Sequence, residues 1–516
     1  MQRQVALAAV LIMVGNIVSR LLGLVREQVM AWLFGATGAT DAFVAASAVP
    51  MILYDLLIGG AISAALVPVL VDQTRDEERL SEVVSALLTL SGALLLVVTL
   101  VLMLLAPAIM AVLGGGFDAP QREQSVTMVR VMLVAVVFQG LAGVLMAVLY
   151  AQQRFASPSF APALYNGAII LAAVGLHPFL GVESLVAGVV LGAALQLALQ
   201  LYSVGRLRYR LTLGFDRPEV RTALRLYAPV AAGMVVTIVG IIIDRYLASL
   251  LDDGSMTIMS YATRLIQFPL GLVGVALSSA ILPTLSSLAG ATADDRETGL
   301  PNYRQALVSG IRVVFFLMAP ALVAIVTLGD PIVELVFQRG QFTDADTGRT
   351  VLALLAYAPQ LPFTAMDQLL IVAFYARKDT RTPVIVGVGT VLVYLGSALV
   401  LLQPLGVVGL ALANAIQNTT HGIILLVLMQ RTVGGVITRE LGMFVLRLVA
   451  AACGMASMQV LGRGLLTDAS PMSTLLLLGV AGGLVYILLC LALRVREPRM
   501  MVSILRRRVD ATGNSV

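Results

Sequence analysis

Residues 83–112 read VVSALLTLSGALLLVVTLVLMLLAPAIMAV, without a charged side chain. A helix of about 20 apolar residues crosses the hydrocarbon core of a bilayer, so this segment predicts a transmembrane helix. Similar apolar runs recur along the whole 516-residue chain, which is 59% hydrophobic and 12% charged. Soluble domains carry roughly 25% charged residues. The sequence therefore predicts an all-α polytopic membrane protein and excludes a soluble one.

Dividing the apolar runs at charged, Pro and Gly breaks gives about fourteen transmembrane helices. The expected spans are 5–34, 41–70, 83–112, 127–151, 159–177, 183–205, 224–251, 256–288, 307–329, 349–375, 383–402, 406–430, 441–462 and 473–493. Arg3 precedes the first run as in a signal peptide, but no small-residue cleavage site follows, so we expect a retained helix. In the last span, Gly479 and Gly483 predict a close-packing face.

The chain repeats itself at an offset of 225 residues. The matched pairs are Tyr150-Ala151 with Tyr375-Ala376, Ser157-Pro158 with Thr382-Pro383, and Leu180-Gly181-Val182 with Leu405-Gly406-Val407. An even number of spans separates the copies, so both have the same orientation. This predicts two six-helix lobes related by a pseudo-two-fold axis along the membrane normal, with a site between them near mid-membrane.

The repeat suggests how the chain is divided. We expect an N-lobe at 1–205, a basic cytoplasmic linker at 206–223, a C-lobe at 224–430, an accessory helix pair at 431–495 and a cytoplasmic tail at 496–516.

Basic residues predict the orientation. Of 34 Lys and Arg residues, 23 fall in one set of alternate loops and 4 in the other. The positive-inside rule then places both termini of this multi-pass membrane protein in the cytoplasm. The net charge of +5 therefore reflects topology, and no nucleic-acid partner is expected. Seven arginines remain within spans, namely Arg20, Arg26, Arg130, Arg245, Arg264, Arg312 and Arg447.

Several chemistries are not indicated. Cys453 and Cys490 lie in apolar runs, and His177 and His421 are far apart, so neither a disulfide framework nor a metal site is predicted. The single lysine, Lys378, forms no phosphate-binding P-loop. We expect a transporter without covalent catalysis, ATP hydrolysis, cofactor or metal, driven by a Na⁺ or H⁺ gradient or by the membrane potential.

Arg20, Arg26 and Arg264 lie well inside expected spans. A mid-membrane Arg costs at least ~2.5–3.5 kcal/mol on insertion scales, so such residues face a polar cavity or a partner. The planar guanidinium fork suits phosphate, and several forks at one cavity predict a polyanion site. The alternative is a structural ion pair of Arg26 with Glu27 or Asp41.

Carboxylates are fewer in these spans: Asp41, Asp55, Asp244 and Asp367. Asp244 adjoins Arg245, which indicates either a structural ion pair or a site for a coupling cation; both interpretations stay open. Asp55, Tyr54 and Gln267 are secondary candidates for the same cavity.

Four ordered blocks resemble the MurJ/MviN family, lipid II flippases of the MOP exporter superfamily. They are SRLLGLVRE at 19–27 with Phe34-Gly35 and 40–43; YATRL at 261–265 with Phe268-Pro269 and 274–277; LVFQRGQFT at 335–343; and FYARKD at 374–379 with Thr382-Pro383. The resemblance implies a fourteen-helix protein whose cavity binds the pyrophosphate and sugar of lipid II.

In that family, the positions of Arg20, Arg26, Asp41 and Arg264 belong to the cavity, and the polyprenyl tail lies in a groove lined by the last two helices. Membrane lipids and cell-wall synthesis proteins are further expected partners. This sequence departs from the family in its second helix, where Tyr54 and Gly59 stand in place of Arg and Glu. Its eleventh helix offers only Thr390, Tyr394 and Ser397 in place of the acidic and amide sodium ligands.

Two other functions remain open at this stage. A flippase for another polyprenyl-pyrophosphate-linked glycan would use the same arginines. A cation-coupled multidrug exporter of the same superfamily would favour a carboxylate-rich cavity, whereas the candidate residues here include more arginine than acid. A third interpretation, a membrane scaffold, leaves the mid-membrane arginines without a role.

Overall fold

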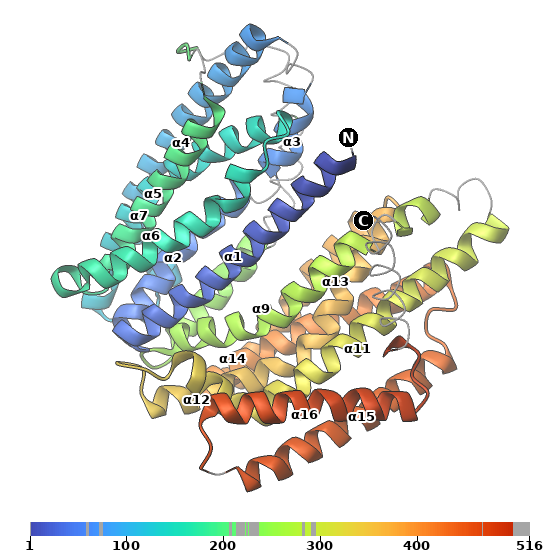
Figure 1. Ribbon diagram of the computed structural model, residues 1–516. Helices are drawn as coiled ribbons and strands as arrows, with labels where there is room; N and C mark the ends of the chain where they lie inside the picture. Colours follow the sequence, from blue (N-terminus) through green and yellow to red (C-terminus); the bar gives the residue numbers. More distant parts are fainter. Residues whose placement is uncertain are drawn as a thin grey trace, which may run out of the picture. The chain divides into compact units, whose positions relative to one another are not determined.

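A computed structural model describes residues 2–57, 61–71, 76–205, 209–212, 222, 225, 237–280, 284–289, 296–466 and 468–498. Every regular element in these ranges is helical (Figure 1). Gly59, most of the expected 206–223 linker and nearly all of the tail lie outside the described residues. The chain forms two compact units, Met1–Thr257 with Arg339–Thr343, and Ile258–Gln338 with Asp344–Val516.

Unit 1 is built around one central helix. Its labelled helices are α1 (Gln2–Phe34), α2 (Gly38–Leu57), α3 (Ala61–Val71), α4 (Glu77–Leu113), α5 (Ala119–Ala151), α6 (Ala156–Leu180) and α7 (Glu183–Val204). Helix α5 packs against α2, α3, α4 and α7, while α6 lies between α1 and α7. Close approach explains part of this packing, because a Cβ at Gly140 of α5 would lie 2.3 Å from Leu95 of α4.

Unit 2 is organised around a long helix. Its elements are α9 (Ser255–Ala280), whose first three residues belong to unit 1, α11 (Arg296–Phe337), α12 (Asp344–Tyr357), the 3₁₀ turn η1 (Ala358–Gln360), α13 (Leu361–Ala376), α14 (Arg381–Val433), α15 (Arg439–Leu465) and α16 (Pro471–Ala492). Helix α11 packs against α12, α13, α15 and α16.

Among the described helices, nine are long and apolar enough to cross a membrane. Large apolar side chains on them are exposed, such as Leu104 at 80% and Leu465 at 85%. A water-soluble protein would bury these groups, so they mark surface suited to lipid. The protein is therefore a multi-pass, all-helical membrane protein, as predicted.

The division of the expected spans differs in three places. The span expected at 41–70 is described as two helices, α2 and α3. The span expected at 349–375 is divided into α12, η1 and α13 at Pro359, whose missing N–H interrupts the helical ladder. The spans expected at 383–402 and 406–430 are joined in α14, with a break at Gly406.

The internal repeat is confirmed in the backbone. Gly181 has φ 55° and ψ −134°, and Gly406, 225 residues later, has φ 54° and ψ −127°. This conformation excludes most side chains, so glycine is required at both positions. Gln153 and Lys378, also 225 apart, share φ values of 58° and 63°.

Hydrogen bonds at this second pair also coincide. The amide after each positive-φ residue donates to the carbonyl five residues before it, Arg154 to Leu149 and Asp379 to Phe374. The C-terminal ends of α5 and α13 therefore have the same backbone structure.

The accessory helices α15 and α16 pack on each other and on α11. Gln459 of α15 fixes their contact by accepting from the Thr327 hydroxyl and donating to the carbonyl of Leu478. The predicted close-packing face at Gly479 and Gly483 is wrong, since an added Cβ there would meet no described atom within 4 Å. The close approach is at Gly482, where a Cβ would lie 2.5 Å from Gln459 Nε2.

Candidate functional site

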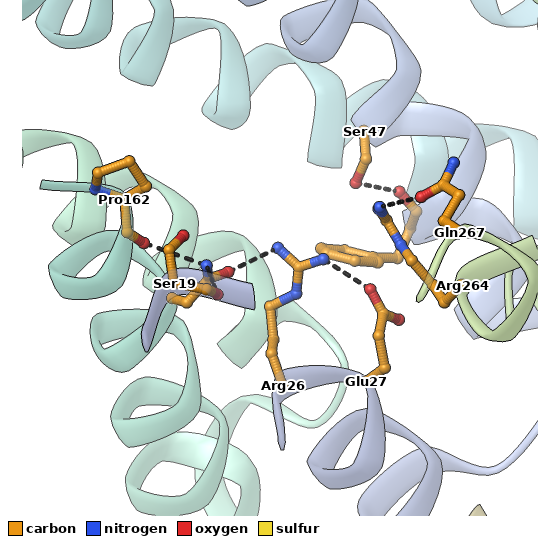
Figure 2. Close-up of polar contacts among 9 residues, drawn as sticks. Ser19, Arg26, Glu27, Ser47, Pro162, Arg264 and Gln267 are labelled. Atoms are coloured by element: carbon orange, nitrogen blue, oxygen red, sulfur yellow. Dashed lines mark hydrogen bonds and ion pairs between the residues drawn. The ribbon is translucent and has the colours of Figure 1, made fainter. Parts of the chain in front are cut away.

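Arg26 of α1 is held at both ends of its guanidinium (Figure 2). Nη2 donates to Glu27 Oε1 at 2.6 Å, and Nη1 donates to Asn166 Oδ1 of α6 at 3.1 Å. Glu27 is buried, and the Arg26 side chain keeps 24% of its surface exposed. The structural ion pair with Glu27 is therefore present. These two contacts use two of the five guanidinium N–H donors, which leaves the fork oriented and able to bind a further anion.

Asn166 is the group that orients Arg26, and sequence reasoning missed it. Its Nδ2 donates to the carbonyls of Pro162 at 3.1 Å and Ser19 at 3.4 Å. These contacts fix the amide so that Oδ1 points at the arginine. The available signal was an amide in an otherwise apolar helix, where a buried polar group needs a partner.

Arg20 is exposed on α1, six residues before Arg26. At 3.6 residues per turn, the two side chains are separated by roughly 120° around the helix. The two arginines therefore do not lie on one stripe of α1.

Asp41, in the first turn of α2, is buried and accepts three hydrogen bonds from the start of α9. Its Oδ2 accepts from the Gly254 amide at 2.8 Å, and its Oδ1 accepts from the Thr257 amide at 2.8 Å and the Thr257 hydroxyl at 2.6 Å. The first amides of a helix lack intrahelical acceptors, and a carboxylate satisfies them and the helix dipole together. Asp41 therefore acts as a remote N-cap for α9.

Two glycines permit the chain to come this close in unit 1. Gly254 has φ 83°, and a Cβ there would lie 2.3 Å from the Ala36 carbonyl oxygen. Gly340 has φ 60°, and a Cβ there would lie 2.3 Å from the Trp32 carbonyl oxygen, which accepts from the Gln341 amide at 3.0 Å. Gly340 and Gln341 of the LVFQRGQFT block thus pack against the end of α1.

Arg264 lies two turns into α9, in unit 2 (Figure 2). Its Nη1 donates to Gln267 Oε1 at 3.3 Å, a contact across one helical turn. One turn before Arg264, the buried Tyr261 ring stacks on Phe337 of α11 with centroids 4.8 Å apart. This stacking anchors the helix segment that carries Arg264.

For the other candidate residues, the structure gives a position and a degree of burial. Tyr54 and Asp55 are half-buried in α2, and Asp244 is half-buried in the helical segment 237–249. Within the described parts of the chain, no three His, Cys, Asp or Glu side chains are grouped closely enough to hold a metal ion.

A second polar pair was not singled out from the sequence. In unit 2, His421 of α14 contacts Asp367 of α13, with Nδ1 and Oδ1 2.7 Å apart. The two residues are 54 positions apart, so only their shared location in apolar spans could have drawn attention to them.

The comparisons with known proteins agree with this fold. A solved structure described as "Lipid II flippase MurJ, inward closed conformation" superposes with a TM-score of 0.79 at 24% identity, covering 94% of this chain and 99% of that one. An inward-facing multidrug resistance MATE family transporter of the MOP superfamily gives a TM-score of 0.68 at 15% identity, covering 81% and 95%. This chain thus shares its fold with both of these solved structures.

The sequence comparisons identify the family. The family model described as "Lipid II flippase MurJ" matches residues 30–480. The probable lipid II flippase MurJ of Haemophilus influenzae is 31% identical over 80% of this chain and 83% of its own. The corresponding Bdellovibrio bacteriovorus protein is 29% identical over 95% of this chain and 96% of its own. The chain belongs to the MurJ lipid II flippase family.

Proposed function

We propose that this protein translocates lipid II from the inner to the outer leaflet of the bacterial cytoplasmic membrane, for peptidoglycan synthesis. The observation that carries the proposal is the family match over residues 30–480. The oriented Arg26 fork supports it, because lipid II presents a pyrophosphate that such a fork can bind in bidentate fashion.

The mechanism is alternating access without covalent chemistry or ATP hydrolysis. Arg26 binds the pyrophosphate, and Arg20 and Arg264 contribute further positive charge to the headgroup. These arginines replace phosphate hydration, which lowers the cost of moving a charged headgroup through the membrane. Asp41 holds the first turn of the helix that carries Arg264. Tyr54, Asp55 and Gln267 provide further polar contacts, and the polyprenyl tail follows the exposed apolar surface of α15 and α16.

Both termini lie in the cytoplasm in this proposal. The transport is driven by the membrane potential or by a cation, and Asp244 is the candidate sodium ligand. Membrane lipids surround the apolar helices, and cell-wall synthesis proteins are the expected protein partners.

The test is leaflet transfer in vesicles that contain the purified protein and lipid II. We expect transfer in the wild type and a large loss in Arg264→Ala and Arg20→Ala, with Arg130→Ala as a control, since Arg130 bonds the Met103 carbonyl. Transfer unchanged in both cavity variants would contradict the proposed site. Transfer of another polyprenyl-pyrophosphate glycan in preference to lipid II, or export of cationic drugs instead, would overturn the proposed substrate.

A further inference from the structure

The His421 ring is flanked by hydrogen-bond acceptors on both nitrogens. Nδ1 lies 2.7 Å from Asp367 Oδ1 of α13, and Nε2 lies 3.3 Å from the carbonyl oxygen of Pro383. A neutral imidazole carries one N–H, whereas the imidazolium carries two. When Asp367 is ionised, both contacts can be hydrogen bonds only if the ring is protonated, so this geometry fits an imidazolium paired with a carboxylate.

The ring also joins three helical segments. Pro383 lies in the first turn of α14, before the break at Gly406, and His421 lies after that break. Asp367 lies on α13. A protonated ring therefore ties both halves of α14 to α13, and loss of one proton removes one of the two bonds.

Asp367 is the charged side chain in contact with the His421 ring. The Asp367 side chain is 16% exposed and the His421 side chain is 12% exposed, so the pair is mostly buried but keeps some solvent-accessible surface. Among the described elements, α12 and η1 also pack extensively on α14. In α12 the charged residues are Asp344, Asp346 and Arg349, all in its first two turns, and η1 carries none. On α14 itself the charged residues are Arg381 and Arg431, near its two ends.

A row of amides continues from the ring along α14. Asn418, one turn before His421, donates to Asn414 Oδ1 at 3.0 Å and contacts Gln360 of η1. The row extends from position 421 to position 414, about 10 Å at 1.5 Å per residue. These amides extend the polar face of α14 beyond the ring.

We propose that His421 and Asp367 form the proton-binding site of this transporter, and that uptake of one proton clasps α13 to both halves of α14. The proton adds to one imidazole nitrogen, which then donates to its acceptor, and no bond between heavy atoms changes. A transporter responds to an ion by the difference in ion affinity between its two states. Hydrogen bonds that form only when the ring is protonated provide this difference in proton affinity between the two states. The inference rests on the proposed translocation.

The first experiment observes the proton directly, by ¹⁵N NMR of histidine-labelled protein in lipid nanodiscs. The chain has two histidines, so His177→Gln is the matched variant. His177 Nδ1 is buried and makes no hydrogen bond to the described residues, and its ring packs edge-on to Phe34. We expect a signal with both nitrogens protonated at pH 7 that persists in His177→Gln and disappears in His421→Gln. In Asp367→Asn we expect a neutral ring, because the carboxylate that balances the imidazolium charge is absent.

The second experiment measures lipid II transfer with and without a pH gradient. We expect the gradient to change the wild-type and His177→Gln rates several-fold, and to leave those of His421→Gln and Asp367→Asn unchanged. If His421→Gln does not fold, the test relies on Asp367→Asn. This variant keeps an oxygen that can accept a hydrogen bond from Nδ1, so we expect it to fold. A neutral ring in the wild type, or a gradient response retained without His421, overturns the proposal. A cationic ring with no transfer of any lipid refutes the proposed function instead.

Discussion

The two copies of the repeat share a backbone and differ in the polar group that each carries. In unit 1, Gly181 separates α6 from α7, and Asn166 of α6 orients an arginine. In unit 2, Gly406 separates the halves of α14, and His421 after the break contacts a carboxylate. The position that corresponds to Asn166, 225 residues later, is Val391. The two copies thus share the backbone conformation at Gly181 and Gly406 but carry different polar side chains.

The difference concerns charge. The Arg26 guanidinium stays charged at physiological pH, so the Arg26–Glu27 ion pair of unit 1 does not respond to pH changes near neutrality. Histidine is the side chain whose charge changes near neutral pH. In the two proposals, the Arg26 cluster of unit 1 binds the anionic headgroup and the His421–Asp367 pair of unit 2 responds to protons.

The largest expected effect is at Arg26. Arg26→Ala removes the cation that pairs with the buried Glu27 carboxylate, and breaking a buried pair costs about 3–5 kcal/mol. If that cost appears in the transport step, lipid II transfer falls on the order of a hundredfold or more, at every pH. The measurement is the initial transfer rate in vesicles between pH 6 and pH 8.

A double variant separates charge balance from anion binding. Arg26→Ala with Glu27→Gln removes the carboxylate charge together with the guanidinium that balances it, so stability returns while transfer stays low. Recovery of transfer in the double variant would show that Arg26 is only a structural partner of Glu27.

The second effect is at Asn166. Asn166→Leu removes the acceptor that orients Arg26 and leaves the ion pair with Glu27 in place. A hydrogen bond to a charged group contributes about 1.5–3 kcal/mol, so we expect a loss of transfer on the order of tenfold. Val391→Asn is the matched control in the second copy, with transfer close to wild type. Equal losses in the two variants would remove the distinction between the copies.

The sequence allowed parts of this arrangement to be predicted. Apolar length predicted the spans, and the fixed offset of 225 predicted the twin breaks at Gly181 and Gly406, because helix endings depend on local residue types. The neighbouring Glu27 made the ion pair of Arg26 foreseeable.

Contacts between distant residues could not be predicted in this way. Asp41 and Thr257 are 216 positions apart, and His421 and Asp367 are 54 apart. A side chain's partner across a helix interface depends on rotation and register, which apolar spans in a membrane leave undetermined. Asp41 was expected at the headgroup cavity, and its role as a cap for α9 became visible only in three dimensions.

The third effect tests the shared backbone. Gly181→Ala and Gly406→Ala each force a side chain into a conformation that costs about 1–3 kcal/mol. The two φ values agree within one degree, so we expect similar losses of thermal stability in detergent. Gly175→Ala is the control, because it lies in α6 and a Cβ there would meet nothing within 4 Å. A loss at only one of the two breaks would show that the copies tolerate strain differently.

The smallest effect distinguishes the two copies at the helix ending. Asp379 accepts from the Thr382 hydroxyl at 2.6 Å and from the Thr382 amide at 3.0 Å, so it caps α14. Its counterpart Arg154 instead donates to the Ser203 carbonyl at the end of α7. Asp379→Ala should reduce stability by about 1 kcal/mol at pH 7, as for other lost caps.

The pH dependence identifies the cap. Hydrogen bonds from the Thr382 hydroxyl and amide hold the pKa of Asp379 below its ordinary value. A carboxylate with a depressed folded-state pKa stabilises the protein above its unfolded pKa of about 4, and this contribution is lost as pH falls through the folded value. The difference between wild type and Asp379→Ala should therefore shrink below pH 4. Asp379→Asn caps without titrating, so its stability relative to Asp379→Ala should stay constant with pH. A gap between wild type and Asp379→Ala that is independent of pH would mean that the carboxylate charge contributes nothing to the cap, and that the two copies differ here only in side-chain shape.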